Sequence, residues 1–396
     1  MRRLAAAASL VLALAAPAAA SAGTVTVDSN GATFTADAGV ANDVTLTIAP
    51  GTFTVTDTGD TITYNPLLET KCDGTGTTTV TCTDSAVTHA SVNLGDLSDH
   101  FHGSGTARIQ VEGSDGDDEI VATPFAPGHE QVAAFVEGGL GNDTLTTGDG
   151  NDNVEDDEGG TDTIKTGAGD DFGEGGPGDN DRVDLGPGND DTSLDATDGV
   201  GDVLDGGPGR DEVNVAAGAV PPPPLEFSLD LTAGAFSAIG SGSASVIGFE
   251  DAGVSQSVRS TVTGTTGANV FEMDKGDDTV NPLDGSDFLL LLEGADHAVT
   301  RDGFADFVRC GPGADAAEVD QLDVALDCET VTTANVRPAS ADRVPPACTL
   351  TGVRARVTRA RLLKRGVSAT IGCDTAAGLE ARLVAVTRST RRGVSA

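Results

Sequence analysis

The feature that most constrains this chain is an aspartate that returns with a nine-residue period between residues 137 and 214. Segments such as GGLGNDTLT, TGDGNDNVE, LGPGNDDTS and GGPGRDEVN share one order of glycines, aspartate and apolar residue. A repeat this short cannot bury its own apolar surface, so successive repeats must stack on one another. The recurring aspartates are Asp143, Asp152, Asp162, Asp171, Asp181, Asp190, Asp202 and Asp211, with spacings of 9, 10, 9, 10, 9, 12 and 9 residues.

Each residue type in the repeat has a chemical role. Glycines let the backbone take positive φ and turn sharply, which leaves carbonyl oxygens pointing inward. Calcium is a hard cation that takes six to eight oxygen ligands, so carbonyls together with an aspartate suit it. An apolar residue follows most of the aspartates by two positions and indicates a short strand with one side chain in a core. These apolar residues are Leu145, Val154, Ile164, Val183, Leu204 and Val213.

The pattern Gly-Gly-x-Gly-x-Asp-x-apolar-x resembles the haemolysin-type calcium-binding repeat of the repeats-in-toxin (RTX) family, in its secreted actinobacterial form. The resemblance implies an all-β fold, a parallel β-roll or β-solenoid, in which two nonapeptides form one coil. It also implies several calcium ions between coils. The motif carries the metal-binding role over to Asp118, Gly139, Gly141, Asp143, Gly148, Gly150, Asp152, Gly167, Gly169, Asp171, Asp181, Gly186, Gly188, Asp190, Asp202, Gly207, Gly209 and Asp211. Among them, Asp181 and Asp202 follow loops that are one residue too long or too short for the motif.

The charge of the repeat region indicates that it needs metal to fold. Residues 112–214 contain 29 acidic side chains against three basic ones, a net charge of −26. Stacked strands lie about 4.8 Å apart, and carboxylates that close repel by about 1 kcal/mol per pair even in water. Because a core of one apolar residue per repeat cannot offset this, we expect folding to be coupled to calcium binding. A disordered acidic linker is the alternative, but a random acidic sequence would not keep the nine-residue phase.

Composition divides the chain into six segments. Arg2 and Arg3 precede an apolar run and the sequence Ala-Ser-Ala, as in a secretory signal. Alternating Thr and Val predict strands in the region that follows, and Pro221–Pro224 cannot join a sheet interior. We expect a signal peptide at 1–22, a β-rich N-terminal cap at 23–110, the calcium-binding β-roll at 111–214, a Pro-rich break with irregular coil at 215–263, degenerate repeats with a terminal cap at 264–336, and a basic β segment resembling a truncated sandwich at 337–396.

A second block of repeats keeps the phase of the first. Its positions are Asn269, Asp278, Asp287, Asp296, Asp306 and Asp315, spaced 9, 9, 9, 10 and 9 residues apart. Its glycines are depleted, as in NPLDGSDFLL and EGADHAVT. We therefore expect the solenoid to continue there with few competent calcium sites.

The six cysteines fall into three local pairs, Cys72 with Cys82, Cys310 with Cys328, and Cys348 with Cys373. Six cysteines allow fifteen connectivities, but export and closeness in sequence favour disulfides within these pairs. Zinc binding is the alternative, and the absence of any Cys-x-x-Cys motif weighs against it.

The charge inverts at residue 337. From there on, twelve Lys or Arg stand against three acidic residues, a net charge of +9. A basic segment suits an anionic cell-surface polymer, phospholipid or nucleic acid, and it can equally contact the acidic roll of its own chain. We expect the polymer or the roll as its partner and do not expect nucleic acid.

Enzyme signatures are missing from the sequence. Neither His-Glu-x-x-His nor Gly-x-Ser-x-Gly occurs. A single tyrosine and no tryptophan weigh against a β-helix polysaccharide-active enzyme, because sugar sites use aromatic platforms. No stretch of eighteen apolar residues predicts a transmembrane segment. We interpret the chain as a secreted, non-enzymatic calcium-ion-binding protein that acts as a cell-surface-associated or extracellular scaffold or adhesin. The alternatives are the non-catalytic repeat portion of a secreted enzyme, or the polysaccharide-active enzyme itself.

Overall fold

The computed structural model describes residues 23–27, 31–65, 71–83, 87–124, 133–156, 158–197, 200–216, 226–239, 242–255, 259–336, 348–351 and 370–373, the last two ranges as backbone only. The described residues contain strands and no helix, so none of them forms a helix that could cross a membrane. The chain divides into two compact units, Met1–Arg337 (unit 1) and Pro338–Ala396 (unit 2). The expected signal peptide and the four prolines at 221–224 lie outside the described residues.

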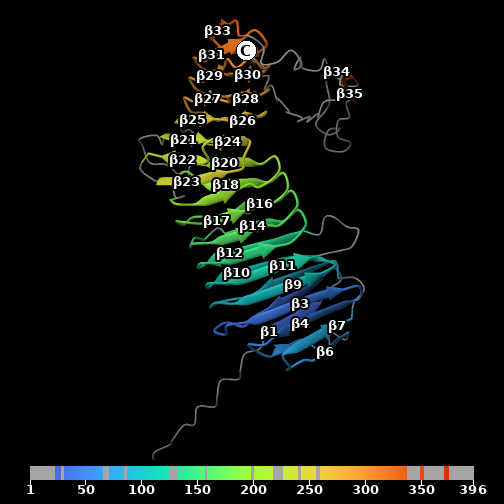
Figure 1. The fold of residues 1–396 in the computed structure, drawn as a ribbon. Coiled ribbons are helices and arrows are strands. Elements are labelled where there is room, and N and C mark those ends of the chain that lie inside the picture. The colour runs from blue at the N-terminus through green and yellow to red at the C-terminus, as the bar shows by residue number, and fades with distance from the viewer. Residues whose placement is uncertain are drawn as a thin grey trace, which may run out of the picture. The chain divides into compact units, whose positions relative to one another are not determined.

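Two long sheets build unit 1, and their strands follow one another largely in chain order (Figure 1). In spatial order, sheet A contains β5 (Ile62–Thr63), β1 (Gly23–Val27), β2 (Gly31–Thr35), β8 (His89–Asn93), β10 (Arg108–Asp115), β12 (Ala134–Leu140), β14 (Asn153–Glu155), β16 (Phe172–Glu174), β18 (Asp191–Asp195), β20 (Glu212–Ala216), β24 (Asp251–Ser255), β26 (Val270–Glu272), β28 (Phe288–Leu290), β30 (Phe307–Arg309) and β32 (Val324–Leu326).

The pairings of sheet B also run in one linear order. They join β6 (Cys72–Asp73), β7 (Thr79–Cys82), β4 (Thr52–Asp57), β3 (Asp43–Ala49), β9 (His100–Gly105), β11 (Glu119–Pro124), β13 (Thr144–Thr147), β15 (Thr163–Lys165), β17 (Arg182–Asp184), β19 (Val203–Asp205), β23 (Gly242–Ile247), β22 (Ala235–Ala238), β21 (Glu226–Asp230), β25 (Arg259–Thr263), β27 (Thr279–Asn281), β29 (His297–Thr300), β31 (Ala316–Asp320) and β33 (Thr330–Ala334).

Within the repeats, consecutive strands alternate between the two sheets, so one coil consists of one strand from each. Leu145 on β13 lies beside Ile164 on β15, and both strands run in the same direction. Val136 on β12 likewise lies beside Val154 on β14. Because these partners are two repeats apart in the sequence, one coil contains two nonapeptides. The parallel β-roll expected from the sequence is therefore confirmed.

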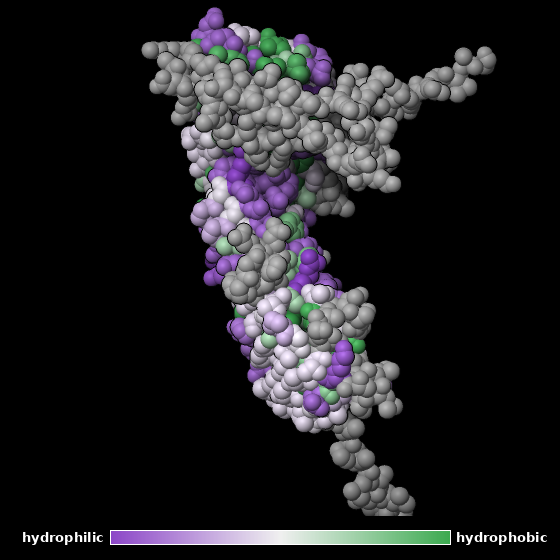
Figure 2. Space-filling view, turned by 90° about the vertical axis from the view of Figure 1, so that its right-hand side faces the viewer, coloured by the Kyte–Doolittle hydropathy of each residue, from purple (hydrophilic) through white to green (hydrophobic). Residues whose placement is uncertain are grey.

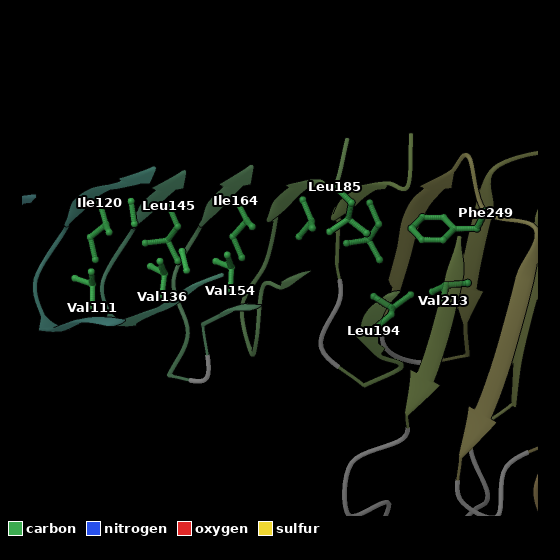
Figure 3. Close-up of a cluster of buried hydrophobic side chains, with 14 of the residues drawn as sticks. Val111, Ile120, Val136, Leu145, Val154, Ile164, Leu185, Leu194, Val213 and Phe249 are labelled. Carbon is green, nitrogen blue, oxygen red and sulfur yellow. The ribbon is translucent and has the colours of Figure 1, made fainter. Parts of the chain in front are cut away.

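The core of the roll is a narrow column of apolar side chains between the sheets. Figure 3 shows Ile120, Leu145 and Ile164 in one row, facing Val136 and Val154 in the other. All of them are at most 3% exposed. Alternation along each strand sends one residue inward and its neighbours outward, so the apolar residue two positions after each aspartate forms the core.

Two repeats lack this apolar residue, and the structure shows what takes its place. In register with Val154, β16 has Gly173 and β18 has Thr192. A Cβ built on Gly173 would lie 2.8 Å from Leu185, which is fully buried and fills the space. The Thr192 hydroxyl donates to the carbonyl oxygen of Gly173 at 2.7 Å, so its polar group is satisfied inside the core.

Antiparallel strands close the N-terminal end of unit 1. Strand β3 pairs with β4, β4 with β7, and β7 with β6, where a disulfide joins Cys72 to Cys82. Phe34, Phe53 and Val80 beneath them are fully buried. The apolar surface of the first coil is thus covered by the chain itself.

The irregular coil expected within 215–263 is not what the structure shows over 226–255. Strands β21, β22 and β23 form an antiparallel meander inserted into sheet B between β19 and β25, and β24 continues sheet A. The physical reason is a two-residue alternation that buries Phe227, Leu229 and Phe236. Both sheets therefore pass without interruption from the first block of repeats to the second.

Unit 2 is described only by the backbone of β34 (Cys348–Thr351) and β35 (Thr370–Cys373), which pair antiparallel. Cys348 and Cys373 are direct partners in this register. Their side chains are not described, so the disulfide between them stays a prediction. In unit 1, the predicted Cys72–Cys82 and Cys310–Cys328 disulfides are both formed.

Candidate metal centre

The recurring aspartates form two ladders that run along the roll. Each backbone N–H donates to the Oδ1 atom of the corresponding aspartate one coil further on, at 2.6–3.0 Å. The sheet-B ladder precedes the strands of sheet B and consists of Asp99, Asp118, Asp143, Asp162, Asp181 and Asp202. The sheet-A ladder precedes the strands of sheet A and consists of Asp152, Asp171, Asp190 and Asp211.

The second carboxylate oxygen of nearly all these aspartates is buried and has no hydrogen-bond partner among the described residues. Unpaired buried carboxylates cost several kcal/mol each, so a protein keeps them only where something else neutralises them. The Oδ2 atoms in this state belong to Asp99, Asp118, Asp143, Asp152, Asp162, Asp171, Asp181, Asp190 and Asp211. The ladders therefore present a regular series of oxygens suited to a cation.

Burial makes these carboxyl groups harder to ionise. Burial, together with the charges of adjacent ladder aspartates, raises the pKa of Asp118, Asp181 and Asp190 to about 7. The pKa of Asp162 and Asp171 rises to about 6 for the same reason. The backbone N–H on Oδ1 opposes the shift without cancelling it. A positive charge beside Oδ2 would remove the cause of the shift.

Backbone atoms of successive turns also approach closely beside the ladders. A Cβ built on Gly188 would collide with the carbonyl oxygen of Gly169 one coil away. Gly186, two residues earlier, has a φ of 82°, which residues other than glycine rarely adopt. These two positions explain the motif glycines: one permits the turn, the other permits the contact. The same close approach occurs at Gly141, Gly169 and Gly209.

A natural substitution at the start of the sheet-B ladder tests what the site accepts. Asn42 stands where later coils have aspartate, and its N–H donates to Oδ1 of Asp99. Its side-chain Nδ2 donates to the carbonyl oxygens of Val40 at 2.9 Å and Leu94 at 3.1 Å. An amide donor thus occupies a pocket of carbonyl oxygens there. Where aspartate stands instead, an oxygen replaces that donor, and a cation is needed to hold the oxygens together.

The donor set fits calcium. Every ligand candidate in the ladders is a carboxylate or a backbone carbonyl, and hard oxygen donors of this kind suit Ca²⁺ rather than zinc or copper. The residues Asp143, Asp152, Asp171, Asp190 and Asp211 would each offer Oδ2 to such an ion. Calcium would supply the positive charge that the buried oxygens lack.

The structure places all eight aspartates predicted as ligands in the two ladders. The predicted glycines precede them, Gly139 near the end of β12 and the others in the turns. Asp181 follows a loop of unusual length, yet it keeps the burial and the unpaired oxygen of its neighbours. Asp202, which ends the sheet-B ladder of this block, accepts the Asp181 amide at 3.0 Å and is 5% exposed. Its Oδ2 is not among the unpaired buried oxygens.

Sequence reasoning left out several aspartates with the same geometry. In the first block these are Asp99 and Asp162. In the second block they are Asp278, Asp287, Asp296, Asp306 and Asp315, each at most 3% exposed with an unpaired Oδ2. As in the first block, backbone N–H groups donate to Oδ1 atoms one coil further on: that of Asp278 to Asp296, that of Asp296 to Asp315, and that of Asp287 to Asp306. The preserved phase, together with a glycine two residues before most of these aspartates, was the signal that could have identified them.

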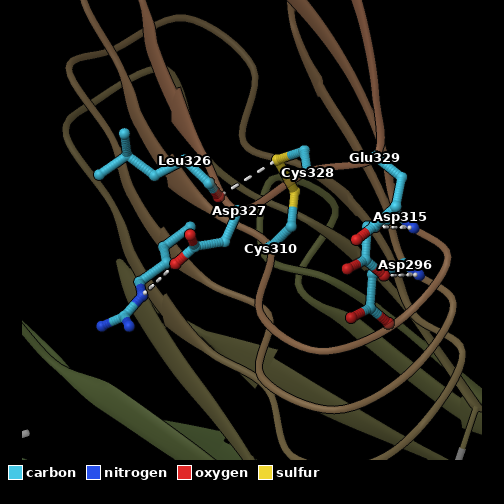
Figure 4. The surroundings of a disulfide bond; sticks show 8 residues. Asp296, Cys310, Asp315, Leu326, Asp327, Cys328 and Glu329 are labelled. Carbon is cyan, nitrogen blue, oxygen red and sulfur yellow. Dashed lines mark hydrogen bonds and ion pairs between the residues drawn. A yellow bond between two sulfur atoms is a disulfide. The ribbon is translucent and has the colours of Figure 1, made fainter.

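A glutamate ends one row of aspartates in each block. The N–H of Asp211 donates to Oε2 of Glu250 at 3.0 Å, and that of Asp315 donates to Oε2 of Glu329 at 2.8 Å. Figure 4 shows Asp296, Asp315 and Glu329 following one another beside the Cys310–Cys328 disulfide. The disulfide therefore closes the coil that carries the last ladder carboxylate.

Fold and site together define a parallel β-roll with rows of buried oxygen donors between its coils. Comparison with known protein families agrees: the family model described as RTX calcium-binding nonapeptide repeat (4 copies) matches three segments, residues 135–155, 156–181 and 260–297. The chain therefore contains RTX-type repeats of the calcium-binding kind. The third matched segment includes Asp278, Asp287 and Asp296 of the second block. No curated protein matches the chain.

Proposed function

We propose that the protein is an exported, non-catalytic scaffold or adhesin whose roll folds on binding several calcium ions. The observation that carries this proposal is the series of buried, unpaired Oδ2 atoms along both ladders. A metal-free roll would bury all of them together, with like charges on neighbouring coils. Calcium bound beside these oxygens would make their burial stabilise the fold instead of destabilising it.

The magnitudes support coupled folding. Extracellular calcium modules bind with dissociation constants of roughly 10⁻⁴ to 10⁻³ M, which corresponds to about 4–5.5 kcal/mol per ion. Several ions together would exceed the repulsion between stacked carboxylates of about 1 kcal/mol per pair in water, and several times that at lower dielectric. Without them, the thin core has little to set against that repulsion.

The distribution of titratable groups supports a non-catalytic role. Aspartates with raised pKa repeat evenly along the ladders, whereas an active site gathers such groups around one nucleophile or base. His100 and His102 point outward from β9, and His100 lies 3.6 Å from the Glu119 carboxylate on the neighbouring strand. RTX repeats are also typically non-catalytic.

Export and surface attachment are the further parts of the proposal. Disulfides persist in oxidising compartments outside the cytosol, and two are formed in unit 1. The net charge of +9 in residues 337–396 suits an anionic cell-surface polymer. On this basis the roll extends from the surface, and unit 2 holds it there.

A calcium titration of the full chain followed by circular dichroism tests the proposal. We expect a largely unfolded repeat region in low-salt buffer with chelator, and a cooperative gain of β signal as calcium reaches the millimolar range. Magnesium at equal concentration is the control, because its demand for octahedral geometry suits the site less well. A β spectrum that is unchanged by chelator would contradict coupled folding.

A further inference from the structure

One buried carboxylate does not belong to either ladder. Asp156 directly follows β14, where Glu155 pairs with Glu137 of β12 on one side and with Glu174 of β16 on the other. The next residues in those strands are Gly138 and Gly175. Asp156 therefore occupies, in its own coil, the position at which both adjacent coils have the first glycine of the repeat.

This position brings Asp156 against two members of the sheet-B ladder. Single carboxylate oxygens of Asp143, Asp156 and Asp162 all lie within 4.8 Å of one another. The three residues are 1%, 0% and 1% exposed. A Cβ built on Gly138 would collide with Oδ2 of Asp156 and lie 2.9 Å from Oδ2 of Asp143. The glycine backbone thus walls the cluster on one side.

Nothing in the described part of the chain satisfies this cluster. Both oxygens of Asp156, and the Oδ2 atoms of Asp143 and Asp162, are buried without a hydrogen-bond partner. The ladder aspartates leave at most one oxygen unpaired, whereas Asp156 leaves two. Three buried side chains therefore bring carboxylate oxygens together where the protein donates no hydrogen bond to Oδ2.

We propose that Asp143, Asp156 and Asp162 form a three-carboxylate calcium site that binds its ion more tightly than the ladder positions do. The inference rests on the proposed function, since it assigns one site among those that calcium is expected to fill. Calcium affinity rises with the number of charged ligands in the site, and the third carboxylate is what the other ladder positions of this block lack. The ion at this site fills first and orders the coils that contain β13, β14 and β15.

A second group of three carboxylates differs from the first. Oxygens of Asp287, Asp302 and Asp306 also lie within 4.8 Å of one another. Asp302, however, is only partly buried, and its two oxygens accept the N–H groups of Phe304 at 2.8 Å and Gly285 at 3.1 Å. Its carboxylate is already satisfied by the protein, so it contributes less to an ion. Tight binding is therefore assigned to the Asp156 trio alone.

Calorimetric titration of the full chain with calcium chloride tests the assignment. In the wild type we expect one ion bound at least tenfold more tightly than the rest. Asp156→Gly should lose that ion and keep the others, because glycine is the residue that adjacent coils have at this position. Asp156→Asn, which keeps the shape of the side chain, should do the same. Asp184→Asn, which removes one exposed charge from β17, is the control and should titrate like the wild type.

The outcomes separate the two proposals. A tight phase that persists in Asp156→Gly, or a wild type whose ions all bind with one affinity, overturns the three-carboxylate site and leaves the proposed function intact. A wild type that binds no calcium contradicts the proposed function itself. If Asp156→Gly does not fold at saturating calcium, Asp156→Asn decides; if neither folds, Asp156 is a structural residue and the site is overturned.

Discussion

At the scale of single residues, each ladder aspartate divides its work between its two oxygens. Oδ1 accepts a backbone N–H from the preceding coil and fixes the turn, as in the 2.8 Å bond from Asp190 to Asp211. In every ladder aspartate except Asp202, Oδ2 accepts no hydrogen bond from the described residues. A substitution that keeps the first oxygen and replaces the second with an amide should therefore preserve the turn and remove a calcium ligand. Asn42 shows that the fold accommodates such an amide.

The second block should bind calcium as the first does. We expect Asp296→Asn and Asp190→Asn each to lower the calcium stoichiometry by at least one ion, because both side chains are buried with an unpaired Oδ2. The measurement is calcium binding at saturation, by equilibrium dialysis of each variant. A loss in Asp190→Asn alone would show that the glycine-poor turns of the second block do not complete a site.

The sequence was sufficient to predict the features that follow from the nine-residue repeat. It was insufficient to predict those that depend on the geometry of individual turns. The nine-residue period places Asp171 and Asp190 in one stacked row, and the structure confirms that row. For the second block, the sequence predicted few competent calcium sites because its glycines are depleted, and leucine stands at two of the turn positions. Leu283 and Leu292 nevertheless take positive φ, 70° and 61°. That conformation costs roughly 1–2 kcal/mol outside glycine, so only the stacked neighbours can impose it, and a single repeat does not reveal them.

The role of Asp156 could not be predicted from the sequence, for a related reason. The loop that contains it, EDDEGGTD, offers several acidic residues in a row, and sequence alone does not say which one turns inward. Register decides: Asp156 aligns with Gly138 and becomes fully buried. Similarly, alternation in residues 226–247 is visible in the sequence, but the insertion of β22 between β21 and β23 depends on pairing partners outside that segment.

At the scale of elements, the stability of both sheets depends on neutralising the ladder carboxylates. Each strand is only a few residues long, so its stability comes from stacking on adjacent coils. Stacking also buries the aspartates and brings their charges together, which raises the pKa to about 7 for Asp118 and Asp296 and to about 9 for Asp306. Neutralisation of the carboxylates, by protons or by calcium, is thus a condition for stacking along the whole ladder.

Acid should therefore partly replace calcium. The folded pKa values lie above the unfolded value of 3.8, so the metal-free roll binds more protons than the unfolded chain, and its stability is lost as pH rises through about 6 to 7. A pKa higher by one corresponds to about 1.4 kcal/mol. Calcium-stripped protein should accordingly show more β signal by circular dichroism at pH 5 than at pH 8. With saturating calcium the order should reverse, because protons then compete with the ion.

Equal disorder of the stripped protein at both pH values would mean that protonation does not relieve the ladders. An exposed-charge variant such as Asp184→Asn should follow the wild type in both conditions, since the aspartate it replaces lies outside the ladders.

At the scale of the whole molecule, the two ends of unit 1 differ. Antiparallel strands cover the N-terminal end, whereas no described residue covers the last coil. Figure 2 shows hydrophobic atoms gathered at that end, where Val324, Leu326 and Val331 are 45–48% exposed. The Cys310–Cys328 disulfide holds this coil to the one before it. Beyond it the charge changes sign, and the chain enters a separate compact unit.

The separation of charge and of units predicts separable roles. Deleting residues 338–396 should leave calcium-dependent folding intact, because every ladder aspartate lies in unit 1. If the basic segment holds the protein on an anionic surface, the shortened protein should appear in the medium when cells that express each form are fractionated. The full-length protein should also detach in high salt, because the Debye length falls from about 10 Å at 0.1 M to about 3 Å at 1 M. If unit 2 instead neutralises the acidic roll, deletion should raise the calcium concentration needed for folding and leave fractionation unchanged. A shortened protein that stays bound to cells would exclude the surface role of unit 2.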